Sequence, residues 1–196
     1  MSVGSHRKIL LVDGHPDPDS GRLVHALCEA YAHGAAEAGH ALRRIELATL
    51  AFPLIGSRAA WADGAPPQPI AAAQADIAWA EHLVFVYPLW LGDMPALLKG
   101  FLEQVARPGF AISGDPERPR RLLKGKSARI VVTMGMPAFV YRHFFGAHSV
   151  KSFERNILGF VGIRPLRAVF FGSVERSVRR RDRWLSRMRT LGQSGR

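Results

Sequence analysis

The chain has 196 residues, 47% of them hydrophobic, which is enough for one domain with a packed core and argues against an intrinsically disordered protein. Its single cysteine, Cys28, excludes an intrachain disulfide, and no apolar stretch approaches the length of a membrane span. The formal net charge is +11, of which +7 comes from the eight arginines and one aspartate of residues 176–196. We therefore expect a cytoplasmic protein with a domain over 1–175 and a basic C-terminal helix or tail over 176–196.

The first predicted unit is a buried strand that enters a helix through a polar turn. Residues 9–12 form a continuous apolar run, typical of a strand covered on both faces. A turn rich in proline and aspartate follows, and Ser20 is a candidate N-cap for a helix that ends near Gly39. Because a helix start has N–H groups without partners, it attracts anions. The glycine fingerprints of nucleotide sites are absent, so this turn is either a phosphate site made by His15, Ser20 and Arg22 or an ordinary capped loop.

The remaining predicted elements continue the alternation of strands and helices. In chain order they are a strand at 42–47, a long loop at 49–69, a helix at 70–80, an apolar strand at 83–87, a helix that opens at Pro95, a loop at 107–127, a strand at 129–133, a helix at 148–161, a strand at 166–171 and a basic helix with an apolar stripe of Val178, Leu185, Met188 and Leu191. This alternation predicts an α/β fold, a doubly wound five-stranded parallel sheet with helices on both faces in three layers.

Three segments rich in functional side chains are predicted at the carboxyl ends of strands, where ligands bind in such sheets. They are residues 15–22, 88–95 and 133–141. The first offers anion donors, the second a rigid apolar surface with backbone amides, and the third a glycine, Gly135, that permits close approach. A ligand with a phosphate at one end and a flat aromatic body at the other matches all three, and a flavin has that shape.

The second of these segments also carries a resemblance to a known family. Residues 87–101, Tyr-Pro-Leu-Trp-Leu-Gly-Asp-Met-Pro-Ala-Leu-Leu-Lys-Gly-Phe, resemble the flavodoxin-fold NAD(P)H quinone dehydrogenases. That group includes the mammalian NAD(P)H quinone reductase and the ancillary oxidoreductases of bacterial potassium efflux systems. The His15-Pro16 turn and residues 108–111 and 133–141 are similar to its flavin and substrate elements. The resemblance covers roughly residues 8–175 and implies a flavodoxin-like, flavin-binding domain.

Carried over by position, the resemblance implies a set of site residues. Those implied to bind the cofactor are His15, Ser20, Arg22 and Leu23 at the phosphate, and Pro88, Leu89, Trp90, Leu91, Gly92, Thr133, Met134, Gly135 and Met136 at the ring. Those implied to be catalytic are Tyr141 and His148, the latter one position out of register. Two departures concern substrate identity. Arg22 stands where the family usually has asparagine, and Met-Gly-Met follows Thr133 where it often has Gly-Gly.

The resemblance also implies a reaction and an assembly. The cofactor would be FMN, with FAD as the alternative, and hydride would pass from NAD(P)H as co-substrate to a quinone or similar acceptor. Tyr141 and His148 would stabilise charge on the acceptor or donate a proton. Members of the family are homodimers with the site at the subunit interface, so a homodimer is expected here.

Other functions are compatible with the same fold. The acceptor could be an azo or nitro compound, or the protein could be a flavin-bearing regulatory subunit of a membrane ion transporter with the basic tail as its peripheral contact. No nucleic-acid-binding motif accompanies the arginines, so we do not expect a nucleic-acid partner, and the apolar stripe favours a surface helix with a solvated arginine face. We expect no metal site either, since the prolines between His15, Asp17 and Asp19 are typical of a turn.

Overall fold

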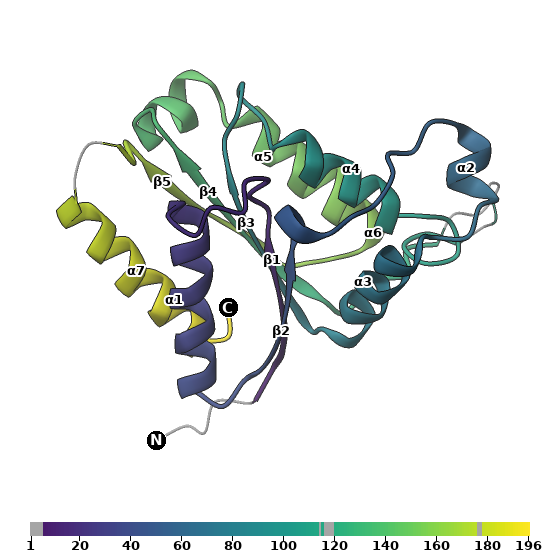
Figure 1. The fold of residues 1–196 in the computed structure, drawn as a ribbon, viewed down its shortest axis with the longest axis horizontal. Helices are drawn as coiled ribbons and strands as arrows, with labels where there is room; N and C mark the ends of the chain where they lie inside the picture. Colours follow the sequence, from purple (N-terminus) through teal and green to yellow (C-terminus); the bar gives the residue numbers. More distant parts are fainter. Residues whose placement is uncertain (1–5, 114, 116–119, 176–177) are drawn as a thin grey trace.

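The computed structural model describes residues 6–113, 115, 120–175 and 178–196. Within these residues, five strands form one parallel sheet in the order β2-β1-β3-β4-β5 (Figure 1). The strands are β1 (Lys8–Asp13), β2 (Ala41–Glu46), β3 (His82–Pro88), β4 (Ser127–Met134) and β5 (Leu166–Gly172). Every neighbouring pair is parallel, and the order reverses direction between β1 and β3. The predicted doubly wound five-stranded sheet is therefore confirmed.

Burial explains why the strands differ in composition. All of β3 is buried, and so are residues 9–13 of β1, which is why both read as continuous apolar runs. In β2, at the sheet edge, Ile45 is the one buried residue, and the strand is correspondingly mixed in composition. The strand predicted at 42–47 is confirmed, with bounds one residue earlier at each end.

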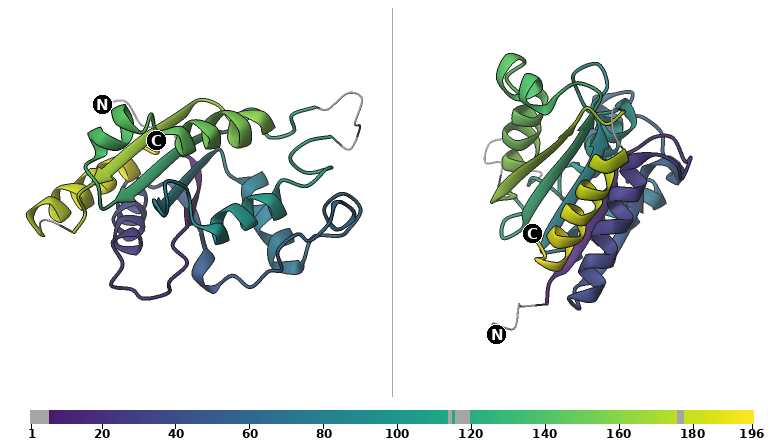
Figure 2. Two further views of the ribbon diagram at one scale, coloured as in Figure 1. Left: turned by 90° about the horizontal axis from the view of Figure 1, so that it is seen from above. Right: turned by 90° about the vertical axis from the view of Figure 1, so that its left-hand side faces the viewer.

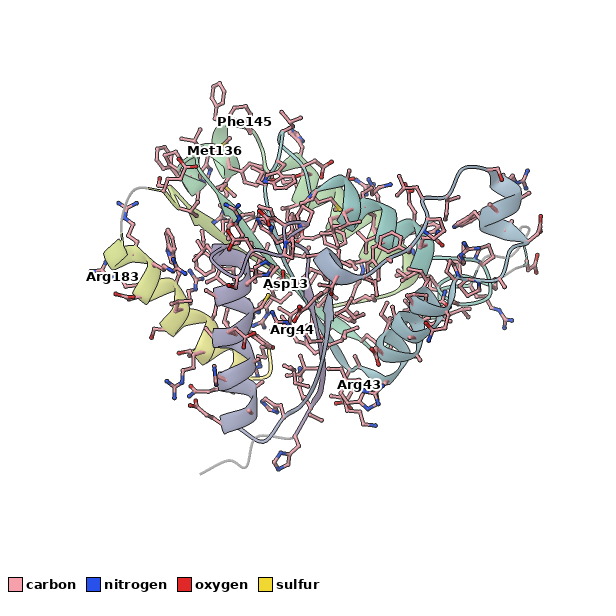
Figure 3. The ribbon with its side chains drawn as sticks, in the orientation of Figure 1. Asp13, Arg43, Arg44, Met136, Phe145 and Arg183 are labelled. Atoms are coloured by element: carbon pink, nitrogen blue, oxygen red, sulfur yellow. The ribbon has the colours of Figure 1, made fainter. Side chains whose placement is uncertain are left out.

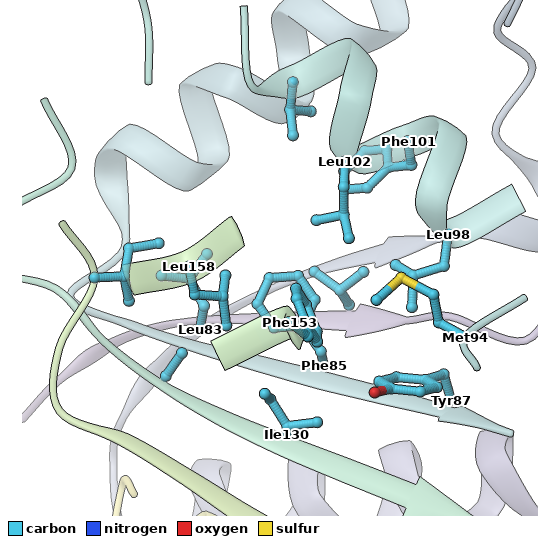
Figure 4. Close-up of a cluster of buried hydrophobic side chains, with 14 of the residues drawn as sticks. Leu83, Phe85, Tyr87, Met94, Leu98, Phe101, Leu102, Ile130, Phe153 and Leu158 are labelled. Carbon is cyan, nitrogen blue, oxygen red and sulfur yellow. The ribbon is translucent and has the colours of Figure 1, made fainter. Parts of the chain in front are cut away.

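Two helical layers cover the sheet, as expected for a three-layer α/β/α fold (Figures 1 and 2). One face carries α1 (Leu23–Glu37) and α7 (Val178–Gln193), which pack on Ile9 and Leu11 of β1. The opposite face carries α3 (Gln68–Trp79), α4 (Ala96–Val105) and a continuous helical stretch made of α5 (His148–Ser152), η3 (Phe153–Leu158) and α6 (Gly159–Val161). Phe153 of that stretch lies edge-on against Phe85 and Tyr87 of β3 (Figure 4). Cys28 of α1 is fully buried in the first layer, as expected for a core residue.

Two predictions about the loops are wrong. Ser20 does not cap α1, which begins at Leu23 with no side-chain cap, because Asp19 already organises the turn. Its carboxylate accepts from the Gly21 amide at 3.0 Å and its carbonyl accepts from the Arg22 amide at 3.0 Å. The segment 49–69 is not wholly irregular either. The helix η1 (Leu47–Thr49) ends at its first residue, and α3 begins at Gln68. Between them lies α2 (Arg58–Ala62), which Ser57 caps by accepting from the Ala60 amide.

The C-terminal helix α7 belongs to the α1 layer. Met188 is fully buried between the helices and the sheet, while the described arginines of α7 face solvent (Arg183 in Figure 3). Gly34 of α1 and Gly192 of α7 permit this contact, because a Cβ at either position would overlap a backbone carbonyl of the other helix. The expected surface helix with an arginine face is confirmed. The side chain of Val178 and residues 176–177, where the predicted boundary falls, lie outside the described residues.

None of the described helices is both long and apolar enough to cross a bilayer. The predicted loop at 107–127 is described except at residues 114 and 116–119. Its first part is anchored by Arg107, which is buried and donates to the carbonyls of Ala60 and Gly64. The loop segment that holds α2 is thereby tied to the end of α4.

Candidate functional site

The three predicted loops meet at the carboxyl edge of the sheet, where β1, β3 and β4 end side by side. The His15 ring lies 5.7 Å from the Trp90 ring, centroid to centroid, in an edge-on arrangement. The Leu89 amide donates to the Thr133 carbonyl at 2.8 Å, which joins the second loop to the third. Residues far apart in the sequence are therefore assembled into one surface, as the parallel topology requires.

The first loop is a chain of side-chain-capped turns. The Asp17 amide donates to His15 Nδ1 at 3.1 Å, and the Asp19 amide donates to the Asp17 carboxylate at 2.9 Å. Beyond these turns, four amides at the start of α1 donate to no acceptor among the described residues. They are those of Ser20, Leu23, Val24 and His25. Such amides, together with the helix dipole, are the elements of an anion site.

Arg22 is already paired in this loop. Its guanidinium contacts the Asp17 carboxylate at 2.6 Å and the Asp19 carboxylate at 3.5 Å. The pKa of Asp17 is lowered, because its carboxylate accepts from the Asp19 amide and from Arg22. Rather than pointing a lone positive charge at a ligand, Arg22 compensates two negative charges that would repel one.

His15 is held as a neutral hydrogen-bond donor. It is buried, and burial together with the neighbouring His25 lowers its pKa. Because Nδ1 accepts from the Asp17 amide, the neutral ring carries its proton on Nε2. Nε2–H is therefore the donor that this side chain can offer to a ligand.

A buried ionic network lies beneath the first loop, and sequence reasoning missed it. Asp13, at the end of β1, is fully buried and pairs with His25 Nδ1 at 2.7 Å and with Arg44 at 3.1 Å (Asp13 and Arg44 in Figure 3). His25 Nε2 also lies 2.8 Å from the Asp17 carbonyl. A carboxylate and a carbonyl can only accept, so both ring nitrogens of His25 must donate and the ring is an imidazolium. Through His25, the network fixes the first loop to the end of β1.

The pKa of His25 follows from this geometry. Burial by itself lowers it, but the hydrogen bonds to Asp13 and to the Asp17 carbonyl outweigh burial and raise it overall. One signal in the sequence could have indicated the network. In the parallel register Leu11 pairs with Arg44 and Asp13 with Glu46, which puts charged side chains of β2 on the same face as Asp13.

We expect this raised pKa to appear as a pH dependence of stability. His25 contributes fully below its unfolded pKa of about 6.5, and its contribution is lost as pH rises through the higher folded pKa. The difference in free energy of unfolding between the wild type and His25→Gln should therefore shrink as pH rises from 5.5 to 9. Urea denaturation measures it, with the same pair compared in an Asp13→Asn background, where the trend should weaken. A difference that stays constant with pH would contradict a protonated His25.

The second loop is a tight hairpin with an exposed apolar tip. Trp90 and Asp93 exchange backbone hydrogen bonds at 2.8 and 2.9 Å, and Leu91 and Gly92 between them have φ of 48° and 82°. Two left-handed residues make the turn type that suits a two-residue hairpin, but at Leu91 that conformation is strained. The Leu91 side chain is fully exposed, and Trp90 is about half exposed.

The hydrogen bonds of this hairpin determine which backbone amides are free to donate to a ligand. Those of Leu89 and Trp90 are bonded to Thr133 and Asp93, so they are not available as donors. Those of Leu91 and Gly92 have no acceptor within the part of the chain that the structure describes. Pro88, the last residue of β3, is buried and contributes shape rather than a donor.

The third loop leaves open space at Gly135. A Cβ at this position would meet the Glu175 carboxylate at 3.7 Å and nothing nearer, and the Gly135 and Met136 amides have no acceptor among the described residues. The loop is fixed by β5, because the Ser173 amide donates to the Met136 carbonyl at 2.9 Å. Thr133 and Met134 are buried, the latter in the core below the loop. Met136 lies at the rim of the sheet (Figure 3).

Tyr141 lies at the end of this loop, in the short helix η2 (Val140–Phe144), and His148 follows at the start of α5. Tyr141 is 2% exposed, and its hydroxyl is 2.6 Å from Ser149 Oγ. His148 is the exposed first residue of α5 and has no hydrogen bond to the described residues. No hydrogen bond or ring contact in the described part of the chain joins either side chain to His15 or Trp90. The geometry thus unites the predicted cofactor residues more closely than the predicted catalytic ones.

Comparison with known proteins agrees with the fold. A 155-residue region is 28% identical to a ribosyldihydronicotinamide dehydrogenase-like protein of Penicillium crustosum, covering 65% of this chain and 57% of that protein. A 96-residue region is 30% identical to an FMN-dependent NADH:quinone oxidoreductase of Bordetella avium, covering 48% and 45%. The chain therefore spans about half the length of the curated relatives it matches.

A solved structure matches over nearly the whole length. The NAD(P)H:quinone oxidoreductase from Methanothermobacter marburgensis superposes with a TM-score of 0.81 at 22% identity, over 98% of this chain and all of that one. At this identity the likeness establishes the fold. The family model described as the flavodoxin-like fold matches residues 7–191. Together with the sheet order and the three loops at its carboxyl edge, this match confirms the resemblance carried by residues 87–101, and the chain belongs to the flavodoxin-like fold family.

Proposed function

We propose that the protein is an FMN-dependent oxidoreductase that passes hydride from NAD(P)H to a quinone or a similar electrophilic acceptor. The observation that carries the proposal is the set of unbonded amides that three loops present at one edge of the sheet, beside a neutral His15. The relatives named as an FMN-dependent NADH:quinone oxidoreductase and a dehydrogenase-like protein support the same class of reaction.

The residues present fit a flavin mononucleotide. Its phosphate would be bound by the amides of Ser20, Leu23 and Val24 and by His15 Nε2–H, beside carboxylates that Arg22 compensates. Its ring would lie against Trp90 and Leu91 and over the open space at Gly135. When bound, a flavin supplies a reversible acceptor of two electrons and a proton.

The protein's own part in the reaction is electrostatic and steric. Amides such as those of Gly92, Gly135 and Met136 are fixed dipoles that favour negative charge without changing protonation state. Trp90 and Leu91 would exclude water from the ligand that they cover.

For proton transfer to the acceptor we propose His148, which is exposed and unbonded among the described residues. Tyr141 would act through Ser149, the partner of its hydroxyl. Comparing quinone reduction by His148→Gln and Tyr141→Phe tests both roles, and full activity in both variants would remove them from the mechanism.

Replacing Gly135 with valine should separate cofactor binding from folding. A Cβ there has no close neighbour and the position does not need a positive φ, so the melting temperature of the cofactor-free protein should change by about 2 °C or less. The side chain would fill space meant for the ring, so the FMN dissociation constant should rise about tenfold or more. Fluorescence quenching of FMN measures the affinity. An unchanged affinity would place the ring elsewhere.

Arg22→Ala should also weaken FMN binding, through a charge effect. Without Arg22, the carboxylates of Asp17 and Asp19 stand uncompensated beside the phosphate, and we expect a rise of about tenfold in the dissociation constant. Adding Asp17→Asn to this variant should restore part of the affinity. Arg43→Ala, which removes a comparable exposed ion pair with Asp76 far from the loop, serves as the control. Equal affinities for Arg22→Ala and the control would remove Arg22 from the phosphate site.

The homodimer remains part of this proposal. Three phenylalanines near the carboxyl end of β4 are exposed in one chain, namely Phe139 (68%), Phe144 (83%) and Phe145 (48%). Exposed aromatic groups of this size are typical of an interaction surface. Sedimentation equilibrium decides the question, and a monomer at micromolar concentration would contradict it.

We also propose that the protein is cytoplasmic, because its proposed co-substrate, NAD(P)H, is present in the cytoplasm. Fractionation of the source cells would test this location.

A further inference from the structure

A pocket lined by basic residues lies at the amino edge of the sheet, opposite the three loops. It encloses about 250 Å³ and is lined by Arg7, His82, Ser127, Ala128, Arg129, Pro165, Arg167 and Arg196. The lining comes from the beginnings of β3, β4 and β5, from the residue before β1 and from Arg196, which follows α7. It holds four arginines and a histidine and no acidic residue. The nearest acid along the chain, Glu81, accepts from the Lys8 amide instead.

Arg129 is the centre of this cavity. The residue is 5% exposed, and it makes no hydrogen bond or ion pair with any described residue. Buried guanidinium groups are ordinarily paired, because an uncompensated charge away from water is costly. Burial lowers the pKa of Arg129. The charges of Arg167 and Arg187 lower it further, while Tyr31 opposes the shift. The site is built for an anion that the chain's described residues do not supply.

His82 is the second unsatisfied group. It is 4% exposed, its Nδ1 lies 2.8 Å from Ser127 Oγ, and its Nε2 has no partner among the described residues. Burial and the charges of Arg129, Arg7 and Arg167 lower its pKa to about 4. The neutral ring can place a proton on Nε2 and donate it to an oxyanion.

We propose that this cavity binds a small phosphate-type dianion, with Arg129 and Arg167 as charge partners and His82 as an additional donor. The volume is below that of most sites for larger organic ligands, which favours inorganic phosphate or a compact phosphate ester. Arginine suits this chemistry because its planar donor array matches phosphate oxygens. The site lies at the other end of the strands from the flavin loops, so it does not depend on the proposed function.

The test uses the full chain in the presence of excess FMN, and inorganic phosphate is the probe. The ring nitrogen resonances of His82 should shift in a saturable way on adding phosphate, and not with sodium chloride at equal ionic strength. Glycerol 3-phosphate in a parallel titration tells a free anion from an ester, and a response to either supports the site. Arg167 is exposed and forms no ion pair among the described residues, so Arg167→Gln should fold normally and weaken phosphate binding tenfold or more.

Arg129→Gln should abolish the phosphate response. If that variant fails to fold, Arg167→Gln alone carries the test. Arg155→Gln removes an exposed arginine outside the cavity and should behave as the wild type. The proposal is overturned if His82 does not respond up to about 100 mM phosphate, if chloride produces the same shift, or if only His15 and His25 respond.

Discussion

Replacing Asp13 with alanine should destabilise the protein by about 3–5 kcal/mol, the usual cost of removing one partner from a buried ionic pair. The carboxylate is inaccessible to solvent and is shared by His25, Arg44 and the His15 amide. Without it, the partly exposed cations of His25 and Arg44 lose their shared buried partner under the first loop. For a domain of this length the melting temperature should fall by roughly 6–20 °C, measured by thermal denaturation and checked with urea.

An exposed pair provides the matched control. Asp76→Ala removes the partner of Arg43, whose side chain is about half exposed, and should cost about 1 kcal/mol or less. Asp13→Asn keeps the shape and part of the hydrogen bonding, so it should fall between the two. A loss below about 1 kcal/mol for Asp13→Ala would mean that Glu29 or Glu46, both paired with Arg44, compensates the network alone.

Gly34→Ala and Gly192→Ala should each destabilise the protein by about 1–3 kcal/mol, although alanine is the better helix former by about 1 kcal/mol. A methyl group at either position overlaps a backbone carbonyl of the facing helix, and backbone cannot rotate away as a side chain can. Helices α1 and α7 must then separate, which uncovers Met188. Urea denaturation gives the free energies.

The double variant sharpens this prediction. One separation of the helices relieves both overlaps, so the combined cost should be smaller than the sum of the two single costs. Gly56→Ala is the control, because a Cβ at Gly56 has no neighbour within 4 Å. If Gly34→Ala is as stable as Gly56→Ala, the close approach of α1 and α7 is not maintained in solution.

The same contact bears on how residues 176–196 are interpreted. We propose that the described part of this segment, α7, is a structural layer of the flavin-binding domain rather than a separate tail, a division that the sequence alone suggested. Deleting it would uncover the apolar face of α1, so deletion cannot isolate a contact with a membrane or transporter. Substituting exposed arginines such as Arg180 and Arg183 leaves the packing intact and tests such a contact directly.

The fold was predictable because its strongest signals are local. Continuous apolar runs mark β1 and β3, a β-branched run marks β4, and the alternation with helices leaves few topologies. Parallel topology then implied that three loops share one edge. The contact of His15 with Trp90 and the hydrogen bond from the Leu89 amide to the Thr133 carbonyl confirm it. These inferences need only residue type and order.

The details of the site were less predictable, because several residues of similar chemistry could fill the same structural role. Ser20 and Asp19 are both good turn formers, and the sequence does not say which will organise the start of α1. Leucine is not a residue expected at positive φ. The sequence therefore predicted neither the hairpin at Leu91 nor which backbone amides would form hydrogen bonds within it. The pairing of Asp13 with His25 depends on how α1 sits on the sheet, which is a property of packing.

The close packing of α1 and α7 at Gly34 and Gly192 joins segments that are synthesised far apart in time. Until α7 has left the ribosome, the inner side of α1, with Val24, Leu27 and Tyr31, has sheet on one side and no second helix beside it. Completion of this layer therefore waits until α7 has been synthesised, since a contact of such sequence separation cannot form earlier. A nascent chain halted before α7 would expose the apolar face of α1, the kind of surface that chaperones bind.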